Sequence, residues 1–90
     1  MSYVTKIEPR ERCAPGQLGN RIYAVNTDQQ HAVTATVRET QHVPGQPQVV
    51  HEKPVDLPPG GSKDLGCSHT PAGSGTYITT TYEVIGEKIH

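Results

Sequence analysis

Two β-prone runs within residues 21–39 constrain this chain most strongly. In the second run, Val33, Ala35 and Val37 alternate with residues of the opposite face, which is the period-2 pattern of a half-buried strand. The first run, residues 22–25, is nearly continuous in apolar residues, as in a central strand that is covered on both sides or has a tyrosine over its outer face. The polar residues 26–30 separate the runs and suit a turn, because Asn and Asp side chains hydrogen-bond to nearby backbone. We therefore predict a hairpin over residues 21–39, with one face buried.

The composition predicts one small domain, residues 1–90, with a thin core. Only 32% of the residues are hydrophobic, and the chain has no Phe and no Trp. The core must therefore be built from Val, Ile, Leu, Ala and the four tyrosines. A chain of this size buries a modest share of its unfolded surface, so a covalent bond, a metal or a partner subunit is expected to add stability.

Charge and hydropathy argue against several functional classes. Eight basic and nine acidic residues give a formal net charge of −1, without the basic surface expected of a nucleic-acid-binding protein. No apolar run approaches the ~20 residues of a membrane-spanning helix, so we expect no membrane insertion. The given sequence also begins without a recognisable signal peptide. Either Met1 is native and the protein stays in the cytosol or enters a particle, or this is a mature segment with an added Met.

The pattern of the rest of the chain also predicts short strands separated by Gly and Pro turns. Residues 3–7 predict an edge strand that Pro9 ends, and residues 48–57 predict an edge strand broken by Pro54. A turn at residues 57–62 leads into a short strand, and residues 76–89 form the longest β-prone run. No apolar stripe with a helical period is present, so we predict no helix longer than a single turn. Six to seven short strands of this kind are typical of an antiparallel β-sandwich.

The turn chemistry resembles that of small bacterial immunoglobulin-like accessory domains. The resemblance rests on residues 13–16 (Cys-Ala-Pro-Gly), an Asn-containing turn, residues 58–62 (Pro-Pro-Gly-Gly-Ser) and residues 65–67 (Leu-Gly-Cys), and it spans most of the chain. The chain has no Trp, so the buried Trp of antibody-type domains is absent. The resemblance implies an immunoglobulin-like sandwich that binds or decorates another structure, an inference from architecture alone.

Cys13 and Cys67 are the two cysteines, and each lies beside a turn next to a predicted strand. We predict that they form a disulfide, which in the chain-entropy model would stabilise the fold by roughly 4 kcal/mol. Such a bond would place the protein outside the cytoplasm or in a particle. The alternative is two unpaired thiols in a reducing compartment, where cysteine behaves as a small buried hydrophobe.

Cys67 and His69 are two residues apart and would share one face of a strand, so they could bind zinc or copper together. A complete site would need further ligands from other histidines, which show no regular ligand spacing. The alternative is that the histidines are scattered over the surface. A Cys–His nucleophile would also need an oxyanion hole and an orienting group, and the carboxylates are spread singly. We therefore expect neither an enzyme nor a bound cofactor.

The last predicted strand carries the best candidates for a binding surface. Tyr77, Thr79 and Thr81 lie on its half-polar face, where an exposed tyrosine could anchor a partner, although burial of the tyrosines is the alternative. The main hypothesis is a non-catalytic accessory or structural protein that docks onto a larger assembly, such as an envelope complex or a phage particle, or self-associates through strand edges. The other hypothesis is a small metal-binding or redox protein that uses Cys67 and His69.

Overall fold

Seven strands form two antiparallel sheets in the computed structural model, which describes residues 3–73 and 75–90. The first sheet has the order β1-β2-β5, and the second has the order β4-β3-β7-β6. Within the described residues there is no helix. The fold is therefore an all-β sandwich, as the strand pattern predicts. The strands are β1 (Thr5–Arg12), β2 (Asn20–Asn26), β3 (Val33–His42), β4 (Val49–Leu57), β5 (Ser62–Cys67), β6 (His69–Pro71) and β7 (Tyr77–Ile89).

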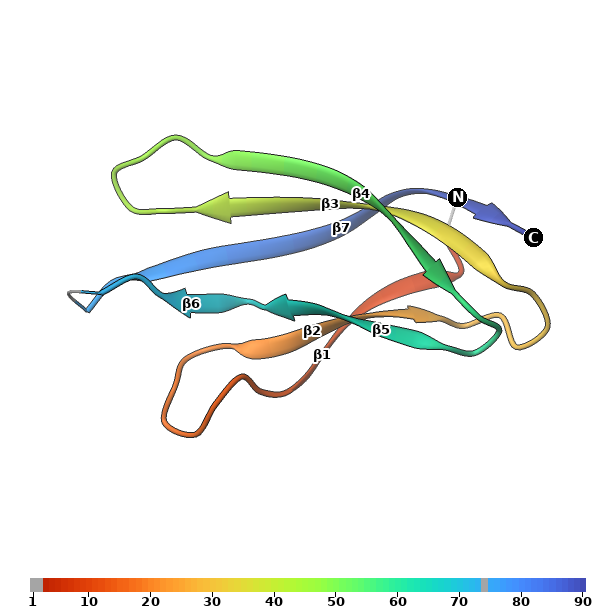
Figure 1. Cartoon of the computed structure of the whole chain (residues 1–90), viewed down its shortest axis with the longest axis horizontal. Coiled ribbons are helices and arrows are strands. Elements are labelled where there is room, and N and C mark those ends of the chain that lie inside the picture. Colours follow the sequence, from red (N-terminus) through yellow and green to blue (C-terminus); the bar gives the residue numbers. More distant parts are fainter. Residues whose placement is uncertain (1–2, 74) are drawn as a thin grey trace.

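The core is thin and lies where the two sheets cross (Figure 1). Its buried apolar side chains are small or medium-sized and come from β2, β3 and β4. The alternation predicted for the second run is confirmed, because Val33, Ala35 and Val37 are all buried. Ile7, Leu65 and Tyr82 pack around the centre of the cluster and are partly buried. The buried apolar residues are Ile22, Ala24, Val33, Ala35, Val37, Val55 and Leu57.

The predicted hairpin over residues 21–39 is wrong, although both of its strands form. β2 is the central strand of the three-stranded sheet, whereas β3 pairs with β4 and β7 in the other sheet. Residues 27–32 therefore carry the chain from one sheet to the other. The period-2 pattern defines the buried face of each strand and says nothing about its pairing partner, which depends on residues distant in the sequence. The tyrosine of the first run, Tyr23, lies on the outer face of β2 beneath the Arg10 guanidinium, whose carbon is 4.4 Å from the ring centre.

Two prolines lie inside strands that they were expected to end or break. Pro9 is paired with Ile22 within β1, and Pro54 is paired with Thr36 within β4. Both strands are at sheet edges, as predicted, and an edge position tolerates a proline whose missing N–H would otherwise face solvent. The edge positions were therefore predicted correctly. The predicted ends of the strands at the prolines were wrong, because an edge strand can continue through a proline.

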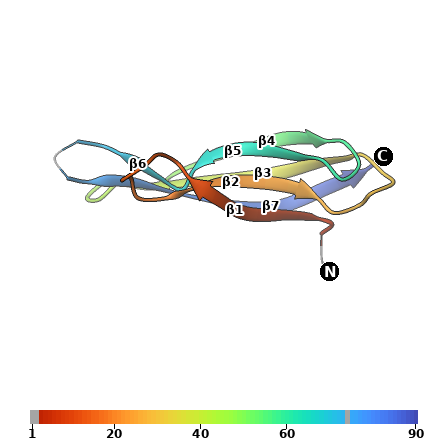
Figure 2. The ribbon, with the colours of Figure 1, turned by 90° about the horizontal axis from the view of Figure 1, so that it is seen from below.

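The four-stranded sheet extends beyond the other sheet at one end. The molecule measures 46 × 29 × 19 Å, and its long axis follows the strands. Figures 1 and 2 both show the ends of the β3–β4 and β6–β7 hairpins reaching past the loop that joins β1 and β2. β4 begins to one side of the three-stranded sheet and crosses towards β5 at its end (Figure 1), and its first six residues are exposed, whereas Val55 and Leu57 are buried in the core.

Candidate functional site

The predicted binding residues share one face of β7. Thr80 is buried, so its neighbours Thr79 and Thr81 point to the outer face of the four-stranded sheet. Tyr77 lies on the same face, and its ring meets the His69 ring edge to face at a centroid distance of 6.4 Å. Thr81 is exposed, whereas Tyr77 and Thr79 are half-buried. The structure therefore gathers the three candidates on one surface and adds His69 to them.

The middle of this outer face is charged, with one guanidinium between two carboxylates. Arg38 of β3 lies between two carboxylates, with Nε 3.2 Å from Glu52 and Nη1 3.5 Å from Glu83. All three side chains are exposed, so each ion pair contributes little to stability. This cluster therefore carries one more negative than positive charge, and the face is polar.

The predicted disulfide is present between Cys13 and Cys67, whose Cα atoms are 5.9 Å apart. It ties the loop after β1 to the end of β5. Cys67 could act as a metal ligand only after reduction, because its sulfur is bonded to Cys13. The His69 Nδ1 atom lies 3.0 Å from the Ser68 hydroxyl. In residues 3–73 and 75–90, no group of three or more His, Cys, Asp or Glu side chains is arranged to hold a metal ion.

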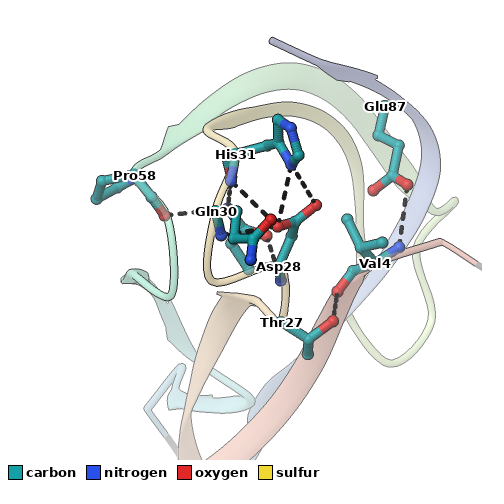
Figure 3. Close-up of polar contacts among 8 residues, drawn as sticks. Val4, Thr27, Asp28, Gln30, His31, Pro58 and Glu87 are labelled. Atoms are coloured by element: carbon teal, nitrogen blue, oxygen red, sulfur yellow. Dashed lines mark hydrogen bonds and ion pairs between the residues drawn. The ribbon is translucent and has the colours of Figure 1, made fainter.

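A buried polar corner fixes the segment that crosses between the sheets (Figure 3). Asn26 is fully buried, and its Nδ2 donates to the carbonyl oxygens of His31 at 2.8 Å and Pro58 at 3.0 Å. Its Oδ1 accepts from the backbone N–H of Asp28 at 2.9 Å. The amide thus bonds to three backbone groups, two in the segment between β2 and β3 and one just after β4, and a buried polar group needs such partners. The hydrogen bonds of the Asn26 side chain therefore have a structural role.

Asp28 organises the same segment through its carboxylate. Its Oδ1 accepts from the backbone N–H groups of Gln30 at 2.8 Å and His31 at 3.1 Å, and its Oδ2 lies 3.1 Å from His31 Nδ1. The N–H of Gln30 has the largest effect, and with the His31 contacts it lowers the pKa of Asp28 below its ordinary value. These bonds confirm that the polar residues 26–30 hydrogen-bond to nearby backbone, as expected of Asn and Asp.

A shallow groove of about 290 Å³ lies between the start of β3 and the end of β4. At its rim Thr34 Oγ1 donates to Asp56 Oδ1 at 2.7 Å and lies 2.8 Å from His90 Nε2. The hydroxyl has one proton, so it donates to Asp56 and accepts from His90. The rest of the lining is largely apolar, so the groove combines a polar rim with apolar walls. The groove is lined by Ala32, Val33, Thr34, Asp56, Leu57, Pro58 and His90.

The exposed edge of β4 is a further candidate that the predicted site residues do not include. β4 pairs with β3 without a register break, and none of the described residues forms a strand along its other side. Val49 and Val50 are 44% and 49% exposed there. Pro54 in an otherwise β-prone run indicated the edge position. The sequence did not reveal that this edge strand is long and regular.

No family model, curated protein or solved structure matches the chain.

Proposed function

We propose that this protein is a non-catalytic, immunoglobulin-like accessory or structural module that docks by strand addition to the β4 edge. The host would be a larger assembly, such as an envelope complex or a phage particle, or another copy of the chain. The observation that carries the proposal is the regular edge of β4, which no strand of the described residues pairs, with two exposed valines at its beginning. An extended partner segment can complete such an edge with backbone hydrogen bonds.

Comparison of the four edge strands favours β4. β1 carries five charged residues and a register shift after Pro9, and irregular, charged edges resist strand addition. The pairing of β5 with β2 shifts in register after Ile22. The β5 residue opposite Ile22 is Gly66, which has a positive φ. β6 has three residues and ends in Pro71. β4 has nine residues in continuous register.

Pro54 identifies the backbone groups that β4 offers to a partner. Proline has no N–H, so the directly opposed pair Thr36–Pro54 must be a non-hydrogen-bonded pair of the antiparallel ladder. Hydrogen-bonded and non-hydrogen-bonded pairs alternate, so Val50 and Glu52 also direct their N–H and C=O groups away from β3. These two residues, together with the Pro54 carbonyl, form the docking edge.

The edge also carries features that limit promiscuous association. Lys53 lies on the core-facing side of the sheet opposite Val37, and Pro54 removes one outward donor. Charged side chains and proline are common means of restricting edge pairing. A partner must therefore fit the short segment from Val49 to Glu52. The disulfide supports a host in an oxidising compartment.

A pair of substitutions at Val50 tests the proposal. Val50→Pro removes an outward N–H that makes no bond to β3, whereas Val50→Thr retains that N–H and the β-propensity. We expect partner capture from extracts of the source cells, or self-association in light scattering, to be lost with Val50→Pro and kept with Val50→Thr. A monomeric wild-type protein that captures nothing, or capture that is equal for both variants, contradicts docking at β4.

A further inference from the structure

We propose that the strand added to β4 is β4 of a second copy, in an antiparallel pair with His51 on the two-fold axis. This inference rests on the proposed docking function and deepens it by naming the partner and the register. The evidence is the self-complementarity of the edge formed by Val49, Val50, His51, Glu52 and Lys53. In a two-fold pair, each residue lies opposite the one equally far from the axis in the other chain.

Pro54 and the charges exclude the neighbouring registers towards the end of β4. An axis at Glu52 places the two Glu52 carboxylates directly opposite each other, and places Pro54 opposite Val50 of the partner subunit, whose carbonyl then has no donor. An axis at Lys53 places the two Lys53 side chains directly opposite each other. Like charges in directly opposed positions destabilise a sheet.

An axis at Val50 is also less favourable. It places Glu52 opposite Gln48 of the partner subunit, which lies outside β4 because the strand begins at Val49. Hydrogen bonding within the strands would then be limited to the two Val50 residues.

The axis at His51 satisfies every outward group between Val49 and Lys53. Val50 lies opposite Glu52 of the partner subunit, and the same pair recurs on the other side of the axis. Each of these pairs exchanges both backbone hydrogen bonds. Val49 faces Lys53 of the partner subunit, so the alkyl part of the lysine covers the exposed valine. The result is one continuous sheet running from β6 of one copy to β6 of the other.

Cysteine cross-linking tests this register directly. The His51 positions form a non-hydrogen-bonded pair with a Cα separation of about 4.5 Å, within the range of a disulfide. Cys13 and Cys67 are already bonded to each other. An introduced cysteine would therefore be the one free thiol among the described residues and the one available for cross-linking. We expect His51→Cys to give a covalent dimer under mild oxidation.

Val49→Cys and Lys53→Cys are the matched controls. In the proposed register, two Val49 positions are about 13 Å apart along the strands, so Val49→Cys alone should remain uncross-linked. The same holds for Lys53→Cys alone. An equal mixture of the two variants should form the mixed disulfide, because these positions face each other.

Sedimentation equilibrium of the wild-type chain and the Val50 variants gives the affinity. We expect a monomer–dimer equilibrium whose dissociation constant rises about tenfold or more with Val50→Pro and changes little with Val50→Thr, because the proline removes one backbone donor from each copy. The thermal midpoints of both variants show whether the monomer remains folded.

Two results overturn the self-pairing. One is a wild-type chain that stays monomeric at millimolar concentration, and the other is cross-linking that is as efficient for Val49→Cys alone as for His51→Cys. A synthetic peptide of residues 46–53 separates this failure from failure of the proposed function. A monomeric chain that binds this peptide through Val50 keeps the edge-docking function and loses the homodimer, whereas a chain that neither dimerises nor captures any partner loses both.

Discussion

Tyr82 of β7 places its phenol oxygen 3.0 Å from the carbonyl oxygen of Leu65 in β5, and this hydrogen bond joins the two sheets. The same oxygen lies 3.2 Å from the Glu39 carboxylate, which competes for the single phenolic proton. Gly66 follows Leu65 with φ +133°, and a Cβ at this position would lie 2.8 Å from the phenol oxygen. The contact between the sheets therefore depends on a glycine beside the tyrosine.

Replacing Gly66 with Ala should destabilise the fold by about 2–4 kcal/mol, because it adds backbone strain and a clash with Tyr82. Gly45→Ala is the control, since Gly45 also has a positive φ but has open space around its Cβ position. We expect it to lose about 1 kcal/mol. In chemical denaturation, the Gly66→Ala/Tyr82→Phe double variant should lose less than the sum of its single variants. Additive losses would show that the clash is unimportant.

Deprotonation of Tyr82 should weaken the fold at high pH. Burial, followed by the nearby Glu39 carboxylate, raises the pKa of Tyr82 to about 12. The unfolded chain loses this proton near the ordinary tyrosine pKa of about 10. The folded state thus binds more protons between these values, so stability is retained below pH 10 and falls as the pH rises towards 12. Tyr82→Phe should show a shallower decline in thermal midpoint over this range, and equal slopes would contradict the assignment.

The Asn26 corner should be among the most sensitive positions in the chain. Asn26→Ala removes three hydrogen bonds and leaves the buried partners of the amide without their bonds, so we expect a loss of about 2–4 kcal/mol in the free energy of unfolding. Asn26→Asp should be at least as damaging near neutral pH, because its carboxylate would face two carbonyl oxygens. Asn20→Ala is a suitable control, since the Asn20 side chain is exposed and donates one bond. Equal effects of Asn20→Ala and Asn26→Ala would contradict the role of the corner.

The Cys13–Cys67 bond should carry a large share of the stability of this thin core. Its removal by Cys13→Ser/Cys67→Ser should cost a few kcal/mol. For a domain near this size, each kcal/mol shifts the midpoint by ~4–8 °C, so we expect the melting temperature to fall by more than about 10 °C. Thermal scans with and without reductant provide the comparison for the wild type. Unchanged midpoints would show that packing or a partner subunit stabilises the fold without the bond.

Several features were predictable from the sequence because they depend on local chemistry. Alternation defined the buried face of β3, proline indicated the edge positions of β1 and β4, and the Asn and Asp side chains between β2 and β3 bond to nearby backbone as expected. The disulfide between Cys13 and Cys67 was predicted from the two cysteines and their neighbouring turns.

Only the tertiary structure decided which strands pair and which polar groups are buried. β2 and β3 are adjacent in the sequence yet belong to different sheets, because pairing depends on packing against β5 and β7, which come later in the chain. From the sequence, Asn26 is expected to be a surface turn residue. In the structure its amide is buried and bonds to the segment between β2 and β3 and to Pro58. The regular edge of β4 likewise follows from its pairing with β3 and its place at the end of the strand order. Strand period and turn chemistry are local properties, whereas sheet order, burial and free edges arise from contacts between distant residues.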